Sequence, residues 1–426
     1  MVDVRSDTHS TARRAAEEIV RTLAGAGHIA YFAGGCVRDE LLGLSPEDYD
    51  VATDATPERL SVLFRRTALV GASFGVVLVR LHGATVEVAT FRSDGPYTDK
   101  RRPDSVTFSD PVSDARRRDF TVNAMFLDPL GPPASPAGTP VSGTVIDHVG
   151  GLGDLRARTL RAVGDPDKRL AEDHLRALRA VRLAAKLGFT LEPGTADAIR
   201  RHARELEGVS HERIGEELRR ILSHPSRALA IDLAQGLGID GPMLGEPSKV
   251  VPLRHLAKLR PESDGPPDVA LCLGAWLFDR GFIPATDDPG PVVSRCRRSL
   301  CLSNEESDAL KALLAASGWI DRHWKTAGTA ARKRNASGPG FASALQLLAC
   351  RSPEEADAIG KEVSALSEDG IGLSPPPLVT GDRLIVLGMK PGPEFKRILD
   401  AVYDAQLEGT VRSPEEGLEL ARGLRV

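Results

Sequence analysis

The stretch Ala33–Asp50, AGGCVRDELLGLSPEDYD, organises the rest of this 426-residue chain. Two glycines stand near its start, and glycine lets the backbone approach a phosphate that a Cβ would keep away. Arg38, three residues after Gly35, can donate two parallel hydrogen bonds to phosphate oxygens. The segment closes on Asp48 and Asp50, which share one face if the chain there is extended. The sequence therefore places a phosphate cradle and a carboxylate pair in one short segment.

Two neighbouring carboxylates, together with the phosphates of a substrate, are the ligands that Mg2+ prefers. A nucleotide cradle and a metal clamp are the parts that phosphoryl transfer requires. Taken alone, an Asp-x-Asp pair is more often an acidic turn or the solvated end of a strand. The residues before the pair and the later segments of the chain decide between these interpretations.

Together with those later segments, this stretch resembles the class II tRNA nucleotidyltransferases and the bacterial poly(A) polymerases, which belong to the polymerase-β nucleotidyltransferase superfamily. The shared motifs GGxVRD, DxD, RRD and EDxxRxxRxxR occur here in that order. The resemblance implies that Gly35 and Arg38 contact the nucleotide triphosphate. It also implies that Asp48 and Asp50 are catalytic and hold Mg2+ as the cofactor.

The composition limits the class of protein. Apolar residues make up 41% and charged residues 27% of the chain, which is typical of a folded protein of several domains. The net charge of -4 argues against attraction to nucleic acid over the whole surface and allows local basic surfaces. Five widely spaced cysteines predict neither a disulfide framework nor a zinc site. The absence of a long apolar run predicts a cytoplasmic protein without a membrane span.

Two apolar segments, 75–81 and 85–92, predict a β-hairpin around Gly83. The second segment carries Glu87, an acid among small residues on its face. A single glutamate on a strand is more often exposed to solvent. Its context, VEVATFR, resembles the family strand that supplies a third carboxylate. That resemblance implies that Glu87 lies beside the metal site and accepts the proton of the attacking hydroxyl.

Residues 95–110, GPYTDKRRPDSVTFSD, have the polar composition of a surface loop. The segment resembles a flexible loop that the family needs to add A after two Cs, and that enzymes adding only CC lack. The matching residues are Asp99, Arg101 and Arg102. The presence of this pattern argues against an activity that stops at CC.

Three consecutive arginines precede the apolar segment at 120–124, and such a run alone is typical of a solvated basic patch. The sequence RRDFTVNA resembles a second family motif. The resemblance implies that Arg118 contacts the nucleotide and that Asn123 supports the site.

Alanine, leucine and arginine dominate residues 170–186, LAEDHLRALRAVRLAAK, and predict one continuous helix. A salt-bridged surface helix is the commoner case for such a segment, with Asp173 and Arg176 as an i, i+3 pair. We expect His174 to lie on its surface. The apolar residues on the remaining faces indicate a helix that is partly buried instead.

This segment closely resembles the family motif that reads the incoming base. The resemblance implies that Asp173 and Arg176 act as a protein template. C and A both carry an amino group on the edge presented, whereas G and U carry a carbonyl, so an acceptor and donor pair can select C and A together. Arg179 and Arg182 would then reach the triphosphate or the ribose.

The chain as a whole predicts an α+β fold. We expect a polymerase-β-like catalytic head with a mixed sheet at 1–155, followed by helical parts. These are a base-recognising neck at 156–223, a body at 224–350 and a tRNA-binding tail at 351–426. In the tail, Lys390 stands in a glycine-rich turn that can meet an RNA phosphate.

The resemblance implies an enzyme that adds CCA to the 3′ end of tRNA from CTP and ATP without a nucleic-acid template. We expect a monomer that binds tRNA and no membrane. An A-adding enzyme and a poly(A) polymerase share the same motifs and stay open as alternatives. A catalytically idle RNA-binding protein with this fold is a more distant alternative, and the intact carboxylates and arginines argue against it.

Overall fold

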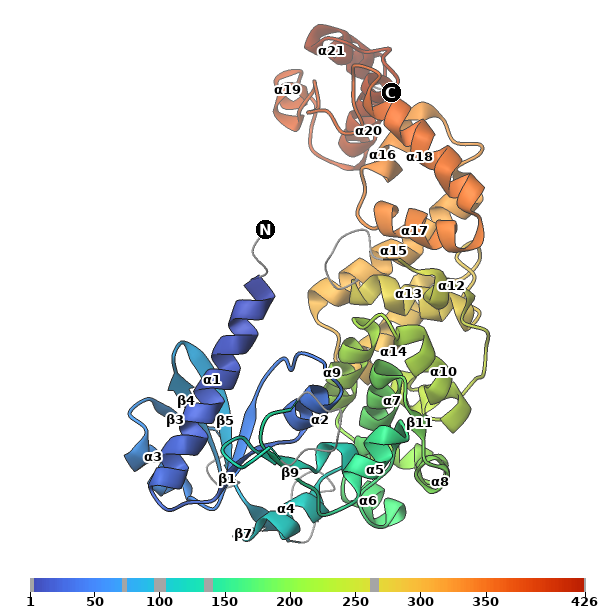
Figure 1. The fold of residues 1–426 in the computed structure, drawn as a ribbon. Helices are drawn as coiled ribbons and strands as arrows, with labels where there is room; N and C mark the ends of the chain where they lie inside the picture. The colour runs from blue at the N-terminus through green and yellow to red at the C-terminus, as the bar shows by residue number, and fades with distance from the viewer. Residues whose placement is uncertain (1–3, 71–74, 96–104, 134–140, 261–267, 425–426) are drawn as a thin grey trace. The chain divides into compact units, whose positions relative to one another are not determined.

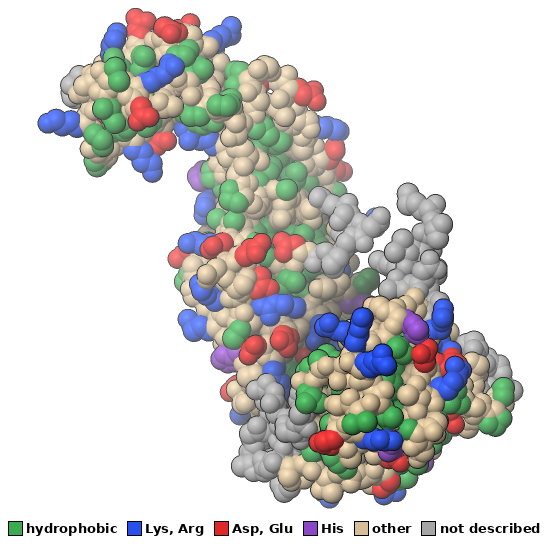
Figure 2. Space-filling view, turned by 90° about the vertical axis from the view of Figure 1, so that its left-hand side faces the viewer, with side chains coloured by type: hydrophobic (Ala, Val, Ile, Leu, Met, Phe, Trp, Pro, Cys, Tyr) green, Lys and Arg blue, Asp and Glu red, His purple; other side chains and the backbone are tan. Residues whose placement is uncertain are grey.

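The computed structural model describes residues 4–70, 75–95, 105–133, 141–260 and 268–424 (Figure 1). The chain divides into two compact units. The first comprises Met1–Glu217 and Leu229–Ser248, and the second comprises Leu218–Ala228 and Lys249–Val426. Basic and acidic side chains are interspersed over the surface drawn in Figure 2.

A seven-stranded mixed sheet forms the core of the first unit, with the strand order β3-β4-β5-β2-β1-β8-β9. Strands β2 and β5 run parallel, and the other neighbours in the sheet are antiparallel. The predicted α+β class with an N-terminal mixed sheet is therefore confirmed. The strands are β1 (Ala30–Ala33), β2 (Asp50–Thr53), β3 (Thr67–Leu69), β4 (Val76–Leu81), β5 (Ala84–Thr90), β8 (Phe126–Asp128) and β9 (Thr144–Ile146).

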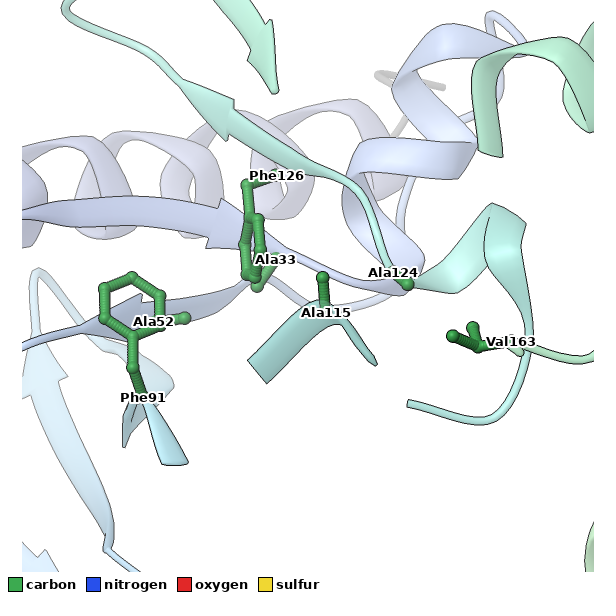
Figure 3. Close-up of a cluster of buried hydrophobic side chains, with 7 residues drawn as sticks. All are labelled: Ala33, Ala52, Phe91, Ala115, Ala124, Phe126 and Val163. Atoms are coloured by element: carbon green, nitrogen blue, oxygen red, sulfur yellow. The ribbon is translucent and has the colours of Figure 1, made fainter. Parts of the chain in front are cut away.

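Helix α1 (Val4–Gly25) lies along the sheet and covers it (Figure 1). Its Ile19, Val20 and Leu23 are fully buried, because apolar residues at helical spacing form one continuous stripe. A second apolar cluster joins β1, β2 and β8 to α4 (Pro111–Arg117), as Figure 3 shows. In that cluster the rings of Phe91 and Phe126 meet edge to face at 5.7 Å. This packing holds the end of β1 close to the end of α4.

The segment 170–186 is not one helix, contrary to the sequence prediction. Helix α6 (Pro166–Glu172) ends before Asp173, whose backbone is extended, and α7 (Arg176–Leu187) begins three residues later. The Asp173 carboxylate accepts a hydrogen bond from the backbone N–H of Leu175 at 3.1 Å. Such a local bond competes with the helical ladder and stabilises the break.

Short elements complete the first unit. Strands β6 (Arg92–Asp94) and β7 (Val106–Phe108) pair with each other, as do β10 (Thr159–Leu160) and β11 (Thr190–Leu191). The remaining helices that position the site are α2 (Gly35–Leu41), α3 (Pro57–Leu63), α5 (Gly151–Arg156), α8 (Pro193–Arg201) and α9 (His211–Leu222), with α10 (Arg227–Leu237) and α11 (Asp240–Leu244) following.

The second unit is helical throughout its described residues. Its last helices enclose a core of their own around Leu384, Ile398 and Val402. Within the described residues, no helix has both the length and the apolar character needed to cross a membrane. The helices are α12 (Arg254–Lys258), α13 (Val269–Asp279), α14 (Pro289–Leu300), α15 (Asn304–His323), α16 (Thr329–Ala336), α17 (Phe341–Arg351), α18 (Pro353–Ser367), α19 (Gly381–Val386), α20 (Pro393–Leu407) and α21 (Pro414–Gly423).

Candidate active site

The turn between β1 and α2 brings two motif segments together. Gly34 has a φ of +78°, a conformation that residues with a Cβ rarely adopt. A Cβ built on Gly34 would lie only 3.0 Å from Nη1 of Arg118, whereas one on Gly35 would make an ordinary contact with Arg38. The close approach thus requires glycine at position 34, and Gly35, the predicted nucleotide contact, is the first residue of α2.

Arg38 is buried at the same place. Its Nη1 donates to the Oδ1 of Asn123 at 2.5 Å, and its Nε donates to the Oδ1 of Asp39 at 2.8 Å. Because Asn123 follows the RRD motif, this bond ties the glycine-rich segment to the second motif. Asn123 fixes the orientation of the guanidinium, which agrees with the supporting role expected for it.

The carboxylates meet on adjacent strands. Asp50 begins β2 and lies directly beside Glu87 in the parallel register of β2 and β5. Tyr49 is buried and its hydroxyl donates to Oε1 of Glu40 at 2.6 Å, while Asp48 is exposed. Since neighbouring residues of an extended chain point to opposite faces, Asp48 and Asp50 lie away from Tyr49.

The crowding of carboxylates affects the protonation of Asp50 and of Glu87. Burial, followed by the charges of Glu87 and Asp48, raises the pKa of Asp50 to about 7, and Arg118 opposes the shift. Desolvation by nearby protein atoms and then Asp48 raise the pKa of Glu87, against the effect of Arg92. Within the described part of the chain, no three His, Cys, Asp or Glu side chains are already arranged around a metal position. The site therefore concentrates negative charge that a cation would relieve.

Arg118 follows α4 and is held by several groups. Its Nε and Nη2 donate to the Oδ2 of Asp114 at 3.1 and 3.0 Å, and its guanidinium lies 5.2 Å from the centre of the Phe126 ring. Asp114 also accepts from Arg117 at 2.7 Å. The two arginines outweigh burial and lower the pKa of Asp114. Asp114 was not among the predicted site residues, although its i, i+3 and i+4 spacing to the arginines is visible in the sequence.

Asp119 is the second residue that the sequence analysis missed. Its Oδ2 accepts from Nε and Nη2 of Arg179 at 2.9 and 2.7 Å, and its Oδ1 accepts from the backbone N–H of Phe120 at 2.8 Å. Burial alone would raise the pKa of Asp119, but Arg179 and these bonds lower it to about 2. Asp119 thus joins the RRD motif to helix α7. Its partner could not be recognised locally, because Arg179 is sixty residues further along the chain.

Asp173 stands in the break between α6 and α7. Its two carboxylate oxygens accept from Nη1 and Nη2 of Arg213, on α9, at 3.1 and 2.7 Å. Arg176 instead donates to the Oε2 of Glu172 at 2.5 Å. The i, i+3 pair of Asp173 and Arg176, which the alternative interpretation as a surface helix predicts, is therefore replaced by two separate pairs.

The neighbouring residues of this break also differ from the sequence prediction. His174, expected on the surface, is buried, because the break turns it inward, with its ring centre 5.8 Å from that of His202. Arg182 donates to the Oε2 of Glu217 at 2.7 Å and so faces α9. The predicted arginines Arg176, Arg179 and Arg182 are thus held by acidic side chains of the same unit, whereas Asp173 is held by an arginine.

Two groups of predicted residues lie elsewhere. Asp99, Arg101 and Arg102, the predicted loop residues, fall outside the described residues. Lys390 is exposed in the second unit, in the turn between α19 and α20 that Gly388 forms with a φ of +77°. The structure thus gathers the carboxylates with Arg38, Arg118 and Asn123, and links them through Asp119 to the neck helices.

Carboxylates that meet on adjacent strands, next to a glycine turn and two arginines, define a nucleotidyltransferase head. In agreement, residues 30–161 match the family model described as poly A polymerase head domain. Residues 188–244 match a second model, described as probable RNA and SrmB-binding site of polymerase A.

The chain belongs to the family of CCA-adding enzymes. It is 34% identical over 416 residues to the CCA-adding enzyme of Geobacillus thermodenitrificans, and this alignment covers 93% of each chain. It is 38% identical to that of Limosilactobacillus fermentum over 298 residues, or 66% of this chain and 71% of the relative. A crystal structure of the Bacillus stearothermophilus CCA-adding enzyme in complex with CTP superposes with a TM-score of 0.74 at 29% identity, covering 96% of this chain and 97% of the other. The predicted family and enzyme class are confirmed.

Proposed function

We propose that this protein adds CCA to the 3′ end of tRNA, using CTP and ATP and releasing pyrophosphate. The observation that carries the proposal is the Asp50 and Glu87 pair beside Arg38 and Arg118, in a chain that aligns along 93% of its length with a CCA-adding enzyme. We further propose that the protein acts on tRNA as a monomer in the cytoplasm.

The donor set suits Mg2+. Asp48 and Asp50 would hold the ion, which supplies activation of the 3′ hydroxyl and stabilisation of the leaving pyrophosphate when bound. The raised pKa values of Asp50 and Glu87 support this assignment, because crowded carboxylates favour a cation among them. Glu87 would accept the proton of the attacking hydroxyl.

The arginines would bind the triphosphate. Asn123 holds the Arg38 side chain in place, and Asp114 holds that of Arg118. Neither side chain therefore loses its full conformational entropy when a nucleotide binds. The backbone at Gly34 and Gly35 lies between them, where a phosphate can approach without meeting a Cβ. Arg179 and Arg182 extend this basic surface along α7.

Asp173 and Arg176 would choose the base. Asp173 can accept from the amino group of C or A, and Arg176 can donate to a ring acceptor. Both are paired inside the protein, with Arg213 and Glu172 respectively, so nucleotide binding would replace or share these bonds. The internal partners keep two charged groups satisfied until the base arrives.

We propose that the loop residues Asp99, Arg101 and Arg102 allow synthesis to proceed to the final A. We also propose that the tail contacts tRNA through Lys390.

One experiment tests the activity directly. Purified protein is incubated with tRNA lacking CCA, tRNA ending in CC and an unrelated RNA, each with single labelled nucleotides. We expect C then A on the first and A on the second. Addition to the unrelated RNA would indicate a poly(A) polymerase, and addition only to CC ends would indicate an A-adding enzyme.

A further inference from the structure

Two arginines of unassigned role stand on the face of the sheet that carries the carboxylates. On β4 and β5, buried valines alternate with residues open to solvent. Arg80 and Glu87 are both among the open residues. Arg80 lies opposite Thr85 in the antiparallel register, and Glu87 follows Thr85 by two residues. Because side chains repeat their direction every second residue, Arg80 and Glu87 share one face.

Arg66 extends the same row. Its carbonyl accepts a hydrogen bond from the backbone N–H of Arg80 at 2.9 Å, which continues the β3–β4 register by one pair. Residues directly opposite in an antiparallel pair have Cβ atoms about 5 Å apart on one face. The structure therefore places two positive side chains next to each other. The backbone of the nearer one, Arg80, lies about 8 Å from the backbone of Glu87.

Without a bound ligand, the pair of Arg66 and Arg80 lowers the stability of the folded protein. Like charges directly opposite on a sheet destabilise it. Within the described residues, neither Arg66 nor Arg80 forms a side-chain hydrogen bond or an ion pair, and both are exposed. Two like charges that face each other without an opposite charge in the protein indicate a site where a ligand supplies that charge.

We propose that Arg66 and Arg80 bind backbone phosphates of the RNA strand whose 3′ end enters the active site. The inference rests on the proposed function, since it needs an RNA acceptor. An RNA end that approaches Asp50 and Glu87 brings phosphates towards carboxylates and is repelled. Arginine forks on the same face offset that repulsion and match phosphate oxygens bidentately.

The test compares Arg66→Gln/Arg80→Gln with the wild type and with Arg59→Gln, a control that removes another exposed arginine of the same unit. Anisotropy of labelled tRNA lacking CCA gives affinity over a range of salt concentrations. We expect the double variant to bind about tenfold more weakly, with the salt slope smaller by about 1 to 2. The KM for tRNA should rise while the KM for CTP stays unchanged, and the control should match the wild type.

Three outcomes would overturn the assignment. An unchanged tRNA affinity and slope would make the pair ordinary solvated surface. A raised KM for CTP with unchanged tRNA binding would place the pair on the nucleotide instead. The third concerns folding: Arg66→Glu creates an opposite-charge pair with Arg80, so its Tm should be no lower than that of the wild type while tRNA binding falls. Weaker binding accompanied by a lower Tm would make the role structural. Binding is measured without turnover, so a failure of CCA addition is seen separately.

Discussion

The bond between Asp119 and Arg179 allows a quantitative prediction, because it joins the head motif to helix α7. Asp119 accepts two charge-assisted bonds from Arg179, and its pKa falls from an ordinary 3.8 to about 2. At about 1.36 kcal/mol per pKa unit, this difference corresponds to roughly 2 to 3 kcal/mol of stability. Since 35% of the Arg179 side chain is exposed, solvent screening reduces the figure to about 2 kcal/mol.

The perturbation is Asp119→Asn, which keeps the shape and removes the charge. The pKa of Asp119 is lower in the folded state, so its contribution is fully present above about pH 4 and is lost as the pH falls towards 2. Urea unfolding should show the variant less stable by about 2 kcal/mol at pH 7 and by about 1 kcal/mol at pH 3. Other carboxylates titrate in both proteins and cancel in the difference.

Asp197→Asn is the matched control. Asp197 pairs with Arg200 at 2.6 Å, but both side chains are more than half exposed. Its replacement should change the free energy of unfolding by less than about 0.5 kcal/mol at either pH. A difference for Asp119→Asn that is equally large at pH 7 and pH 3 would refute the electrostatic reasoning, because an uncharged contact does not titrate. A difference at pH 7 no larger than that of the control would refute it as well.

The remaining predictions concern catalysis. Asp48→Ala or Asp50→Ala should reduce nucleotide addition by more than about a hundredfold with tRNA binding nearly intact, and a smaller loss would contradict the metal-clamp role. Deletion of Asp99–Pro103 should spare CC addition and remove A addition, read from product lengths on tRNA lacking CCA; full-length product would make the segment ordinary surface. Asp173→Ala should relax discrimination against UTP and GTP about ten- to a hundredfold in kcat/KM, whereas an unchanged ratio in a folded protein would remove the protein template. Gly34→Ala should lower kcat/KM for both nucleotides, because a Cβ there meets a guanidinium and needs a strained φ; wild-type kinetics would show that the turn adapts.

Local sequence signals were sufficient for the elements around the site. The apolar alternation on either side of Gly83 predicted the β4–β5 hairpin, and the period of two placed Glu87 on an open face. The parallel register that sets Asp50 beside Glu87 could not be predicted, because it pairs strands that are not consecutive in the chain. Register between distant strands depends on the packing of the whole sheet.

The neck shows where helix propensity is overridden. Residues 170–186 are strong helix formers, yet Asp173 interrupts them. Arg213, forty residues away, compensates the partly buried carboxylate with two hydrogen bonds, so the break is stabilised by tertiary contacts. A composition-based reading treats Asp173 as one more charge on a helix face and cannot anticipate this.

The same contacts suggest why the motif aspartates and arginines are spaced as they are. Three acidic residues each accept hydrogen bonds from an arginine: Asp119 from Arg179, Asp173 from Arg213 and Glu217 from Arg182. Each acid comes from a different segment of the first unit. A buried charge without its partner costs several kcal/mol, so each pair constrains where two segments can lie relative to each other. Reading a base by hydrogen bonds tolerates little displacement, because donor and acceptor must stay about 3 Å apart. The charge pairs that stabilise the neck, of which Asp119–Arg179 joins it to the head, therefore also set the geometry from which Asp173 and Arg176 would meet a nucleotide.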